Sequence, residues 1–214
     1  MQLMCGGPRL ADIERGLIAM ATKKRKDRAD SREKWIELAR EAFIKDGAAA
    51  ISINEIAKKL DVTRGSFYWW FKSLADLQTA LIKDWQKRNN EPYLAALSGD
   101  DRPIKRFWRL VFLWAGQGAY NPDYDTAMRS WAHSTPKIAK AVRDVDDTRI
   151  SALTQLFRDA GQDEAQAVVR ARIVYFSQVG YYALGVRYPA RDRVEYTETS
   201  IKIMTGFDDI AVDD

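Results

Sequence analysis

The residues best suited to chemistry in this chain are those that could contact a nucleic acid. Arg64, Gly65, Ser66, Tyr68 and Trp69 follow one another within six positions. A guanidinium and hydroxyls hydrogen-bond base edges and phosphate oxygens, and a glycine lets the backbone approach closely. An arginine that pairs with guanine O6 and N7 contributes about 1–3 kcal/mol of discrimination between bases. This chemistry requires an element that presents these side chains together to solvent.

Residues for catalysis or metal binding are scarce. The chain has one histidine, His133, and one cysteine, Cys5, and it lacks a G-x-S-x-G motif and a phosphate-binding loop. Asp144, Asp146 and Asp147 cluster at helical spacing, which we interpret as a solvated helix face. We therefore expect no enzyme activity, no metal and no cofactor.

Two short helices joined by a tight turn would position the nucleic-acid candidates, between Ser52 and Phe71. Ser52 and Glu55 have the spacing of a capping box, and Thr63 is placed to cap the second helix. Asp61 occupies the turn, where a residue with positive φ is often required. One apolar face is predicted to be shared by Ile56, Leu60, Val62, Phe67 and Trp70. The pattern predicts a helix-turn-helix unit.

Two further helices are predicted to flank this unit. The first covers Ser31 to Asp46, with a stripe of apolar residues including Trp35, Ala39 and Phe43, and it ends at Gly47. The second runs from about Leu74 to Asn89. Its N-terminus lies beside Lys72, and free N–H groups there favour a phosphate.

The rest of the chain is also predicted to be helical. From Glu91, Pro92 and the run Ser98 to Asp101 indicate a loop. Helices are then expected at about 103–116, 123–132, 136–160, 163–187 and 194–207. The predicted fold class is all-α, with a three-helix helix-turn-helix domain for DNA followed by a second, helical domain. We assign residues 1–30 to a disordered extension, 31–77 to the first domain and 78–214 to the second.

The positive charge is concentrated near the two-helix unit. Residues 22–90 hold 16 Lys and Arg against 10 Asp and Glu, whereas residues 91–214 hold 16 against 18. Such a patch favours a polyanion, although chance asymmetry of a solvated surface is the alternative. Lys23, Lys24, Arg25, Lys26 and Arg28 form either a basic arm for DNA or a solvated tail. A single cysteine and the lack of a signal peptide or spanning segment predict a cytoplasmic protein without membrane contact.

The sequence around the two-helix unit resembles the N-terminal domain of the TetR family of transcriptional regulators. The resemblance covers about residues 31–80, and the matching residues taken together are specific to this family. It rests on Ala42-Phe43, Gly47, Ser52, Ile56-Ala57, Val62-Thr63, Gly65-Ser66, Phe67-Tyr68 and Phe71. The family usually has a lysine at the start of the next helix, where this chain has Leu74. A phosphate contact there would fall to Lys72, two residues earlier, or to the backbone N–H groups.

The resemblance implies roles for individual residues in the DNA complex. Arg64, Ser66 and Trp69 become candidates for base contact, with Gly65 allowing close approach. The phosphate candidates are Ser52, Thr63, Tyr68 and Lys72. For Trp69 the alternative is packing on Trp70 and Phe71 in the core, and for Tyr68 a purely structural role.

A dimer and a small-molecule effector are also implied. One such helix reads one half-site, so a homodimer on a palindromic operator is expected. The candidate dimer residues on the last two helices are Ile173, Phe176, Gly180, Leu184, Ile201 and Met204. The candidate lining of a pocket for a small apolar or aromatic ligand is Trp108, Phe112, Trp131, His133 and Tyr175, with Arg129 and Gln178 as polar contacts. Both sets could instead pack in the domain's own core.

Together these features predict a sequence-specific, DNA-binding transcriptional regulator, a repressor whose binding a ligand alters. A non-specific architectural DNA-binding protein is the first alternative, and it would not need a large aromatic second domain. A helical enzyme is the second alternative, and the residues offer little for it.

Overall fold

The computed structural model describes residues 32–116, 120–186, 190–207 and 209–211. Within these ranges the chain is helical and holds no strand, which confirms the all-α prediction. The predicted extension, the basic arm and Ser31, where the first helix was predicted to begin, lie outside the described residues.

The N-terminal unit packs around aromatic side chains. Residues 32–46 are helical, and they are followed by the short η1 (Ala48–Ala50), α2 (Ile53–Lys59) and η2 (Arg64–Trp69). Trp35 and Phe67 meet edge to face with ring centroids 5.3 Å apart, and Phe71 stacks on Phe67. Gly47 ends the first helix with φ 81° and ψ −178°. The positive φ agrees with the prediction, but the extended ψ lies outside the αL region and is accessible almost only to glycine.

A long helical rod leads from this unit into the rest of the molecule. It consists of α3 (Leu74–Trp85), a π-helical turn η3 (Gln86–Asn90) and α4 (Glu91–Leu97). The predicted loop from Glu91 is therefore wrong up to Leu97. Pro92 is accommodated because it lies in the first turn of α4, where a missing N–H is tolerated. The π turn directly before it interrupts the regular hydrogen-bond pattern that a proline would otherwise break.

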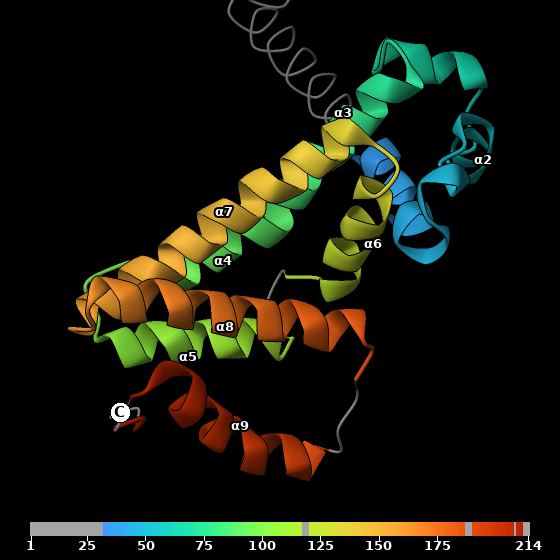
Figure 1. Cartoon of the computed structure of the whole chain (residues 1–214). Coiled ribbons are helices and arrows are strands. Elements are labelled where there is room, and N and C mark those ends of the chain that lie inside the picture. Colours follow the sequence, from blue (N-terminus) through green and yellow to red (C-terminus); the bar gives the residue numbers. More distant parts are fainter. Residues whose placement is uncertain (1–31, 117–119, 187–189, 208, 212–214) are drawn as a thin grey trace, which may run out of the picture.

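Five further helices build the second half of the chain. They are α5 (Pro103–Trp114), α6 (Pro122–Ala132), α7 (Pro136–Asp159), α8 (Glu164–Ala183) and α9 (Ala190–Thr205). Figure 1 shows α7 running alongside α4, with α8 packed on α7 and α9 next to α8. The predicted end of α8 at residue 187 and start of α9 at residue 194 were each about four residues late. Among the described residues, no helix combines the length and the apolar character needed to cross a bilayer.

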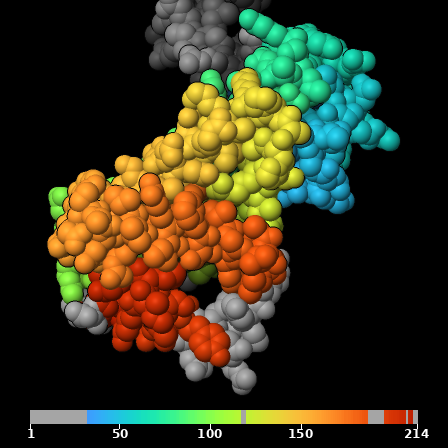
Figure 2. Space-filling view, in the orientation of Figure 1, coloured from blue at the N-terminus to red at the C-terminus, as the bar shows by residue number. Residues whose placement is uncertain are grey.

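Helix α6 joins the N-terminal unit to the second half. Phe43 of the first helix packs edge to face on Tyr124 and Trp131 of α6, with centroids 6.0 and 5.3 Å apart. The same apolar cluster continues into α7 through Ile138, Val142 and Val145. Figure 2 shows the N-terminal unit at one end of the molecule and α8 and α9 at the other. A change in the position of α6 would therefore shift the residues of the N-terminal unit that pack on it.

Candidate functional site

The turn between α2 and η2 is built by local interactions that follow the sequence pattern. The Ser52 hydroxyl accepts a hydrogen bond from the Glu55 backbone N–H at 3.4 Å, as its position at the N-cap of α2 predicts. Asp61 has φ 54°, the only positive φ of a non-glycine residue among those described. The Val62 N–H donates to the Ala57 carbonyl oxygen at 3.0 Å and closes the turn. These contacts set the direction in which η2 leaves α2.

The second element differs from the prediction in its geometry. Residues Arg64–Trp69 form a 3₁₀-helix, and Thr63 occupies its N-cap without accepting a backbone hydrogen bond through its side chain. The predicted Thr63 cap is therefore wrong. Its hydroxyl lies 3.3 Å from that of Ser66, and the turn is instead closed by the Ser66 N–H donating to the Thr63 carbonyl oxygen. The tighter winding brings side chains three residues apart onto the same face.

Most of the nucleic-acid candidates on η2 point to solvent. Arg64, Gly65 and Tyr68 are exposed, and Trp69 is 79% exposed, which excludes core packing for Trp69. Ser66 is half-buried against Thr63. Phe67 and Phe71 are fully buried and hold η2 on the rest of the unit. These two buried rings therefore fix the position of the exposed face of η2 on the N-terminal unit.

One apolar residue of the predicted shared face is misplaced. Val62 is 42% exposed, whereas Ile56 and Phe67 are buried as expected. The backbone at Val62 already bends out of the turn after the positive φ of Asp61, which directs the side chain to solvent. Val62 therefore belongs to the exposed face next to Arg64.

The start of α3 carries a full set of capping contacts. The Ser73 hydroxyl accepts from the Asp76 N–H at 3.2 Å, and the Asp76 carboxylate accepts from the Lys72 N–H at 3.0 Å. A carboxylate already occupies this helix N-terminus, so it is less favourable for a phosphate than a free terminus would be. The exposed Lys72 side chain is the remaining positive group there, and Leu74 is half-buried.

A cavity of about 220 Å³ lies in the second half of the chain, between α4, α5, α6, α7 and α8. Two predicted lining residues, His133 and Tyr175, border it, and so do Arg129 and Gln178. The predicted residues Trp108, Phe112 and Trp131 do not border this cavity. Trp108 stacks on Phe112 and its indole N–H donates to the Ile210 carbonyl oxygen at 2.9 Å. Trp131 packs on Phe43 and borders a separate hollow between the N-terminal unit and α6.

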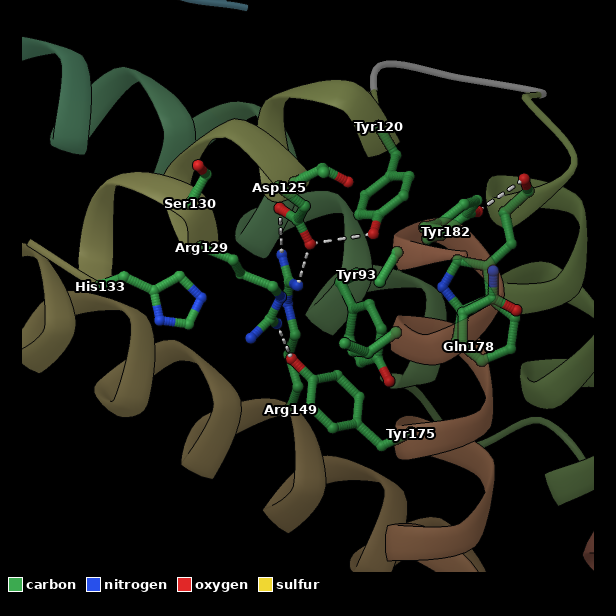
Figure 3. A pocket seen from close by; sticks show the side chains of 14 residues that line it. Tyr93, Tyr120, Asp125, Arg129, Ser130, His133, Arg149, Tyr175, Gln178 and Tyr182 are labelled. Atoms are coloured by element: carbon green, nitrogen blue, oxygen red, sulfur yellow. Dashed lines mark hydrogen bonds and ion pairs between the residues drawn. The ribbon is translucent and has the colours of Figure 1, made fainter. Parts of the chain in front are cut away.

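An ion pair between Asp125 and Arg149 forms one wall of this cavity (Figure 3). Asp125 is 5% exposed and Arg149 is 1% exposed, and Arg149 Nη1 donates to Asp125 Oδ2 at 2.6 Å. The guanidinium also lies over the rings of Tyr93, Tyr120 and Trp85, at 5.0 to 5.9 Å from their centroids. The buried guanidinium is therefore stabilised both by the carboxylate and by the surrounding aromatic rings.

Asp125 also accepts hydrogen bonds from three neutral donors in different parts of the chain. Its oxygens accept hydrogen bonds from Trp85 Nε1, from Asn89 Nδ2 at 2.7 Å and from the Tyr120 hydroxyl at 3.0 Å. Burial alone would raise the pKa of Asp125, but the charge of Arg149 and these hydrogen bonds lower it below its ordinary value. Asp125 therefore remains ionised at neutral pH.

The sequence interpretation missed this pair. One signal for Arg149 was present, because it lies four residues after Val145 and four before Leu153, within the buried stripe of α7. A lone charge in an apolar stripe indicates a buried ion pair, but the identity of its partner depends on long-range packing.

A second ion pair lies at the cavity edge. Arg129 donates to both carboxylate oxygens of Asp146, at 2.9 and 2.6 Å, and also to the Tyr175 hydroxyl at 2.8 Å. Burial raises the pKa of Tyr175 to about 12. Interpreting Asp146 as part of a solvated face was therefore wrong, while Asp144 pairs with Lys140 on the exposed face as expected.

The predicted dimer residues fall into two groups. Ile173, Phe176 and Leu184 form an exposed stripe on α8, and Gly180, between the last two, has open space where a Cβ would stand. Ile201 is 2% exposed and Met204 is half-buried, and both pack in the chain's own core. Exposed apolar residues that the sequence interpretation missed are Val169 on α8 and Tyr196 and Ile203 on α9.

Comparison with known proteins agrees with this architecture. A family model described as bacterial regulatory proteins, tetR family, matches residues 36–81. The chain is 38% identical over 90 residues to the HTH-type transcriptional regulator AcrR of Shigella flexneri, a match that covers 41% of this chain and 42% of AcrR. It is 32% identical over 82 residues to the HTH-type transcriptional regulator TtgR of Pseudomonas putida, a match that covers 38% of this chain and 39% of TtgR. The chain thus spans about two fifths of the length of these curated relatives.

The similarity of fold extends further than the similarity of sequence. A transcriptional regulator of the TetR/AcrR family from Thermobifida fusca has a TM-score of 0.61 to this structure at 20% identity, covering 84% of this chain and 100% of that one. The helix-turn-helix unit and the helical second half define a TetR-type architecture. Residues 36–81 match the TetR-family model, and the chain as a whole shares the fold of a TetR/AcrR regulator.

Proposed function

We propose that this protein is a sequence-specific DNA-binding transcriptional repressor, and that η2 enters the major groove. The observation that carries the proposal is the exposed face of η2, seated on the buried Phe67 and Phe71. Arg64 and Trp69 face the bases in this arrangement, while Tyr68 and Lys72 contact phosphates. The protein would act where the DNA is, in the cytoplasm.

Sequence-specific binding of this kind needs two copies of η2. The face of η2 is only six residues long, so it reads one short half-site. The exposed stripe of α8, with Tyr196 and Ile203 of α9, supplies an apolar surface at the end of the molecule opposite η2. We propose that two copies pair through this surface by a twofold axis and bind a palindromic operator.

Replacing Phe176 by aspartate should convert the dimer into a monomer. The carboxylate would be buried without a partner at the centre of the stripe, and by twofold symmetry this happens twice per interface. Sedimentation equilibrium measures the mass directly. Val62→Asp is the matched control, since Val62 is also exposed but lies on the N-terminal unit, at the end of the molecule opposite α8 (Figure 2). Unchanged self-association of Phe176→Asp would contradict the proposed interface.

Replacing Lys72 by alanine should weaken DNA binding equally for all sequences. The exposed ammonium contacts a phosphate in the proposed complex, so its loss removes charge attraction without changing base contacts. Plots of log affinity against log salt concentration should lose about one unit of slope per subunit. A change in base preference would instead place Lys72 at the bases.

A small-molecule effector would act through α6. Trp85 of α3 and Asn89 of η3 both donate to Asp125 of α6, and the Tyr124 hydroxyl donates to the Leu81 carbonyl oxygen at 2.8 Å. The cavity borders α6 at Asp125 itself and one turn further on, at Arg129, and it also borders His133. We propose that a ligand in this cavity favours a position of α6 and α3 in which the two copies of η2 no longer match the operator.

The function is tested by measuring DNA binding by fluorescence anisotropy. Genomic fragments that include the region upstream of the protein's own gene are compared with random duplexes of equal length. The proposal predicts at least one fragment bound about 1,000-fold more tightly than random DNA. Equal affinity for all fragments, with a steep salt dependence, would favour the architectural alternative.

A further inference from the structure

Two buried hydrogen-bond donors at the cavity lack a partner. Tyr93 is 1% exposed, and neither its hydroxyl nor the Trp114 indole N–H has a hydrogen-bond partner among the described residues. Both side chains border the cavity, and their ring centroids are 6.1 Å apart. Each donor atom is covered by neighbouring side chains, so a ligand pairs with it only after a small shift of those side chains. Buried polar groups of native proteins are nearly always paired, so two unpaired donors in one cavity indicate a ligand that pairs with them.

The nature of these donors defines the ligand atom that they need. An indole N–H only donates, while a tyrosine hydroxyl donates and accepts. A ligand that satisfies both must therefore present an acceptor, such as a carbonyl, ester or ether oxygen. The rings of Tyr93, Tyr120 and Tyr182 around this position favour an aromatic ligand.

The charges near the cavity are already balanced. Arg149 is paired with Asp125, and Arg129 is paired with Asp146. An anionic ligand would bring an unpaired negative charge close to the buried Asp125. An ammonium group offers no acceptor to the two donors, and Arg149 already occupies the cation position against Tyr93 and Tyr120. The balance favours an uncharged ligand.

The volume matches a single ring. An apolar cavity of about 150 Å³ holds benzene, and most sites for drug-sized ligands measure about 300–1,000 Å³. The cavity here, at about 220 Å³, lies between these values. It has room for one benzene ring with a small substituent.

We propose that the cavity binds an uncharged, single-ring aromatic compound whose oxygen accepts hydrogen bonds from Tyr93 and Trp114. The Tyr93 hydroxyl and the Trp114 indole N–H select for the acceptor, and the surrounding rings select for the aromatic group. The effector role of such a compound rests on the proposed function, but its binding to the cavity does not.

Calorimetric titration of the full-length protein without DNA tests the binding. The probes are methyl benzoate, which has acceptor oxygens, and toluene, benzoate and benzylamine, which lack an acceptor or carry charge. Methyl benzoate should bind at least about fivefold more tightly than each of the others. Tyr93→Phe should reduce its affinity by about 2–10-fold and leave the affinity for toluene unchanged. Trp114→Phe, which also enlarges the cavity, should lower the ratio of the methyl benzoate affinity to the toluene affinity. Equal affinities for methyl benzoate and toluene in the wild type would overturn the proposal.

The stability of the ligand-free variants provides an independent readout. Tyr93→Phe removes a buried hydroxyl that has no partner among the described residues, so its Tm should be equal to or above that of the wild type. Tyr124→Phe is the matched control, because its hydroxyl donates to Leu81 and it does not border the cavity. The control should lower Tm by about 2–4 °C and leave the methyl benzoate affinity unchanged. A Tm for Tyr93→Phe as low as that of the control would show that the hydroxyl is already paired, against the proposal.

The DNA measurement separates this inference from the proposed function. Binding of methyl benzoate with the expected variant pattern, together with the absence of operator binding, would leave the cavity assignment standing and refute the repressor. Specific operator binding together with no preference for methyl benzoate would refute only the ligand class.

Discussion

Replacing Asp125 by asparagine is expected to lower the free energy of unfolding by about 3–5 kcal/mol, because it leaves the Arg149 charge buried and unpaired. Arg149 is 1% exposed, so water does not reach the guanidinium in place of the carboxylate. The variant also weakens the hydrogen bonds that Trp85 and Asn89 donate to this position. Urea unfolding followed by circular dichroism measures the loss.

Asp144→Asn is the matched control for this prediction. Asp144 is exposed and pairs with Lys140 one helical turn away, so its replacement should change stability by less than about 1 kcal/mol. A similarly small effect of Asp125→Asn would contradict the assignment of the buried pair as a structural link between α6 and α7.

The pH dependence of stability follows from the same carboxylate. The folded-state pKa of Asp125 lies below its ordinary value, so its charged form stabilises the fold above the unfolded-state pKa. This contribution is lost as the pH falls below about 4 and through the folded-state pKa. The slope of stability against pH in this acidic range should be smaller in Asp125→Asn than in the wild type.

Replacing Arg64 by alanine is expected to produce the largest loss of specific DNA binding. A bidentate contact to guanine contributes about 1–3 kcal/mol in each half-site, so a dimer should lose about 30-fold or more in operator affinity. Affinity for random DNA should fall much less, because only one positive charge per subunit is removed. Binding to operator variants should also show relaxed preference at the base pair that Arg64 contacts.

Arg143→Ala is the charge-matched control. Arg143 is exposed on α7 in the second half of the chain, away from η2. Its loss should leave the ratio of specific to non-specific affinity unchanged. An equal effect of the two replacements on that ratio would remove Arg64 from the base-reading face.

Features of the fold that depend on neighbouring residues were predictable from the sequence. Ser52 and Asp61 act within a short stretch of chain, and each has the cap or the conformation that its position predicts. Phe67 and Phe71 follow from apolar spacing. The 3₁₀ winding of η2 and the continuation of the helix through Pro92 were not predictable in the same way, because each depends on how a turn is closed in three dimensions.

The cavity was predictable only in part, for the same physical reason. His133 and Tyr175 were found because they are aromatic residues in a helical second half, but Trp108 and Phe112 have the same character and pack elsewhere. Tyr93 was missed because its segment was predicted to be a loop. The Asp125–Arg149 pair joins α6 to α7, and no local pattern connects two residues 24 positions apart. Ile201 likewise has the spacing of an interface residue, and only the packing of α9 shows that it is buried in its own chain.

The central claim is that η2 reads DNA sequence as part of a symmetric dimer, and one measurement tests it most directly. The full-length protein is used to select bound duplexes from a random pool, and the enriched pool is sequenced. The account predicts a palindromic motif with two half-sites separated by about one helical turn, and Arg64→Ala should reduce enrichment of a guanine within each half-site. A pool without an enriched motif, or one with a single unpaired half-site, would contradict the claim.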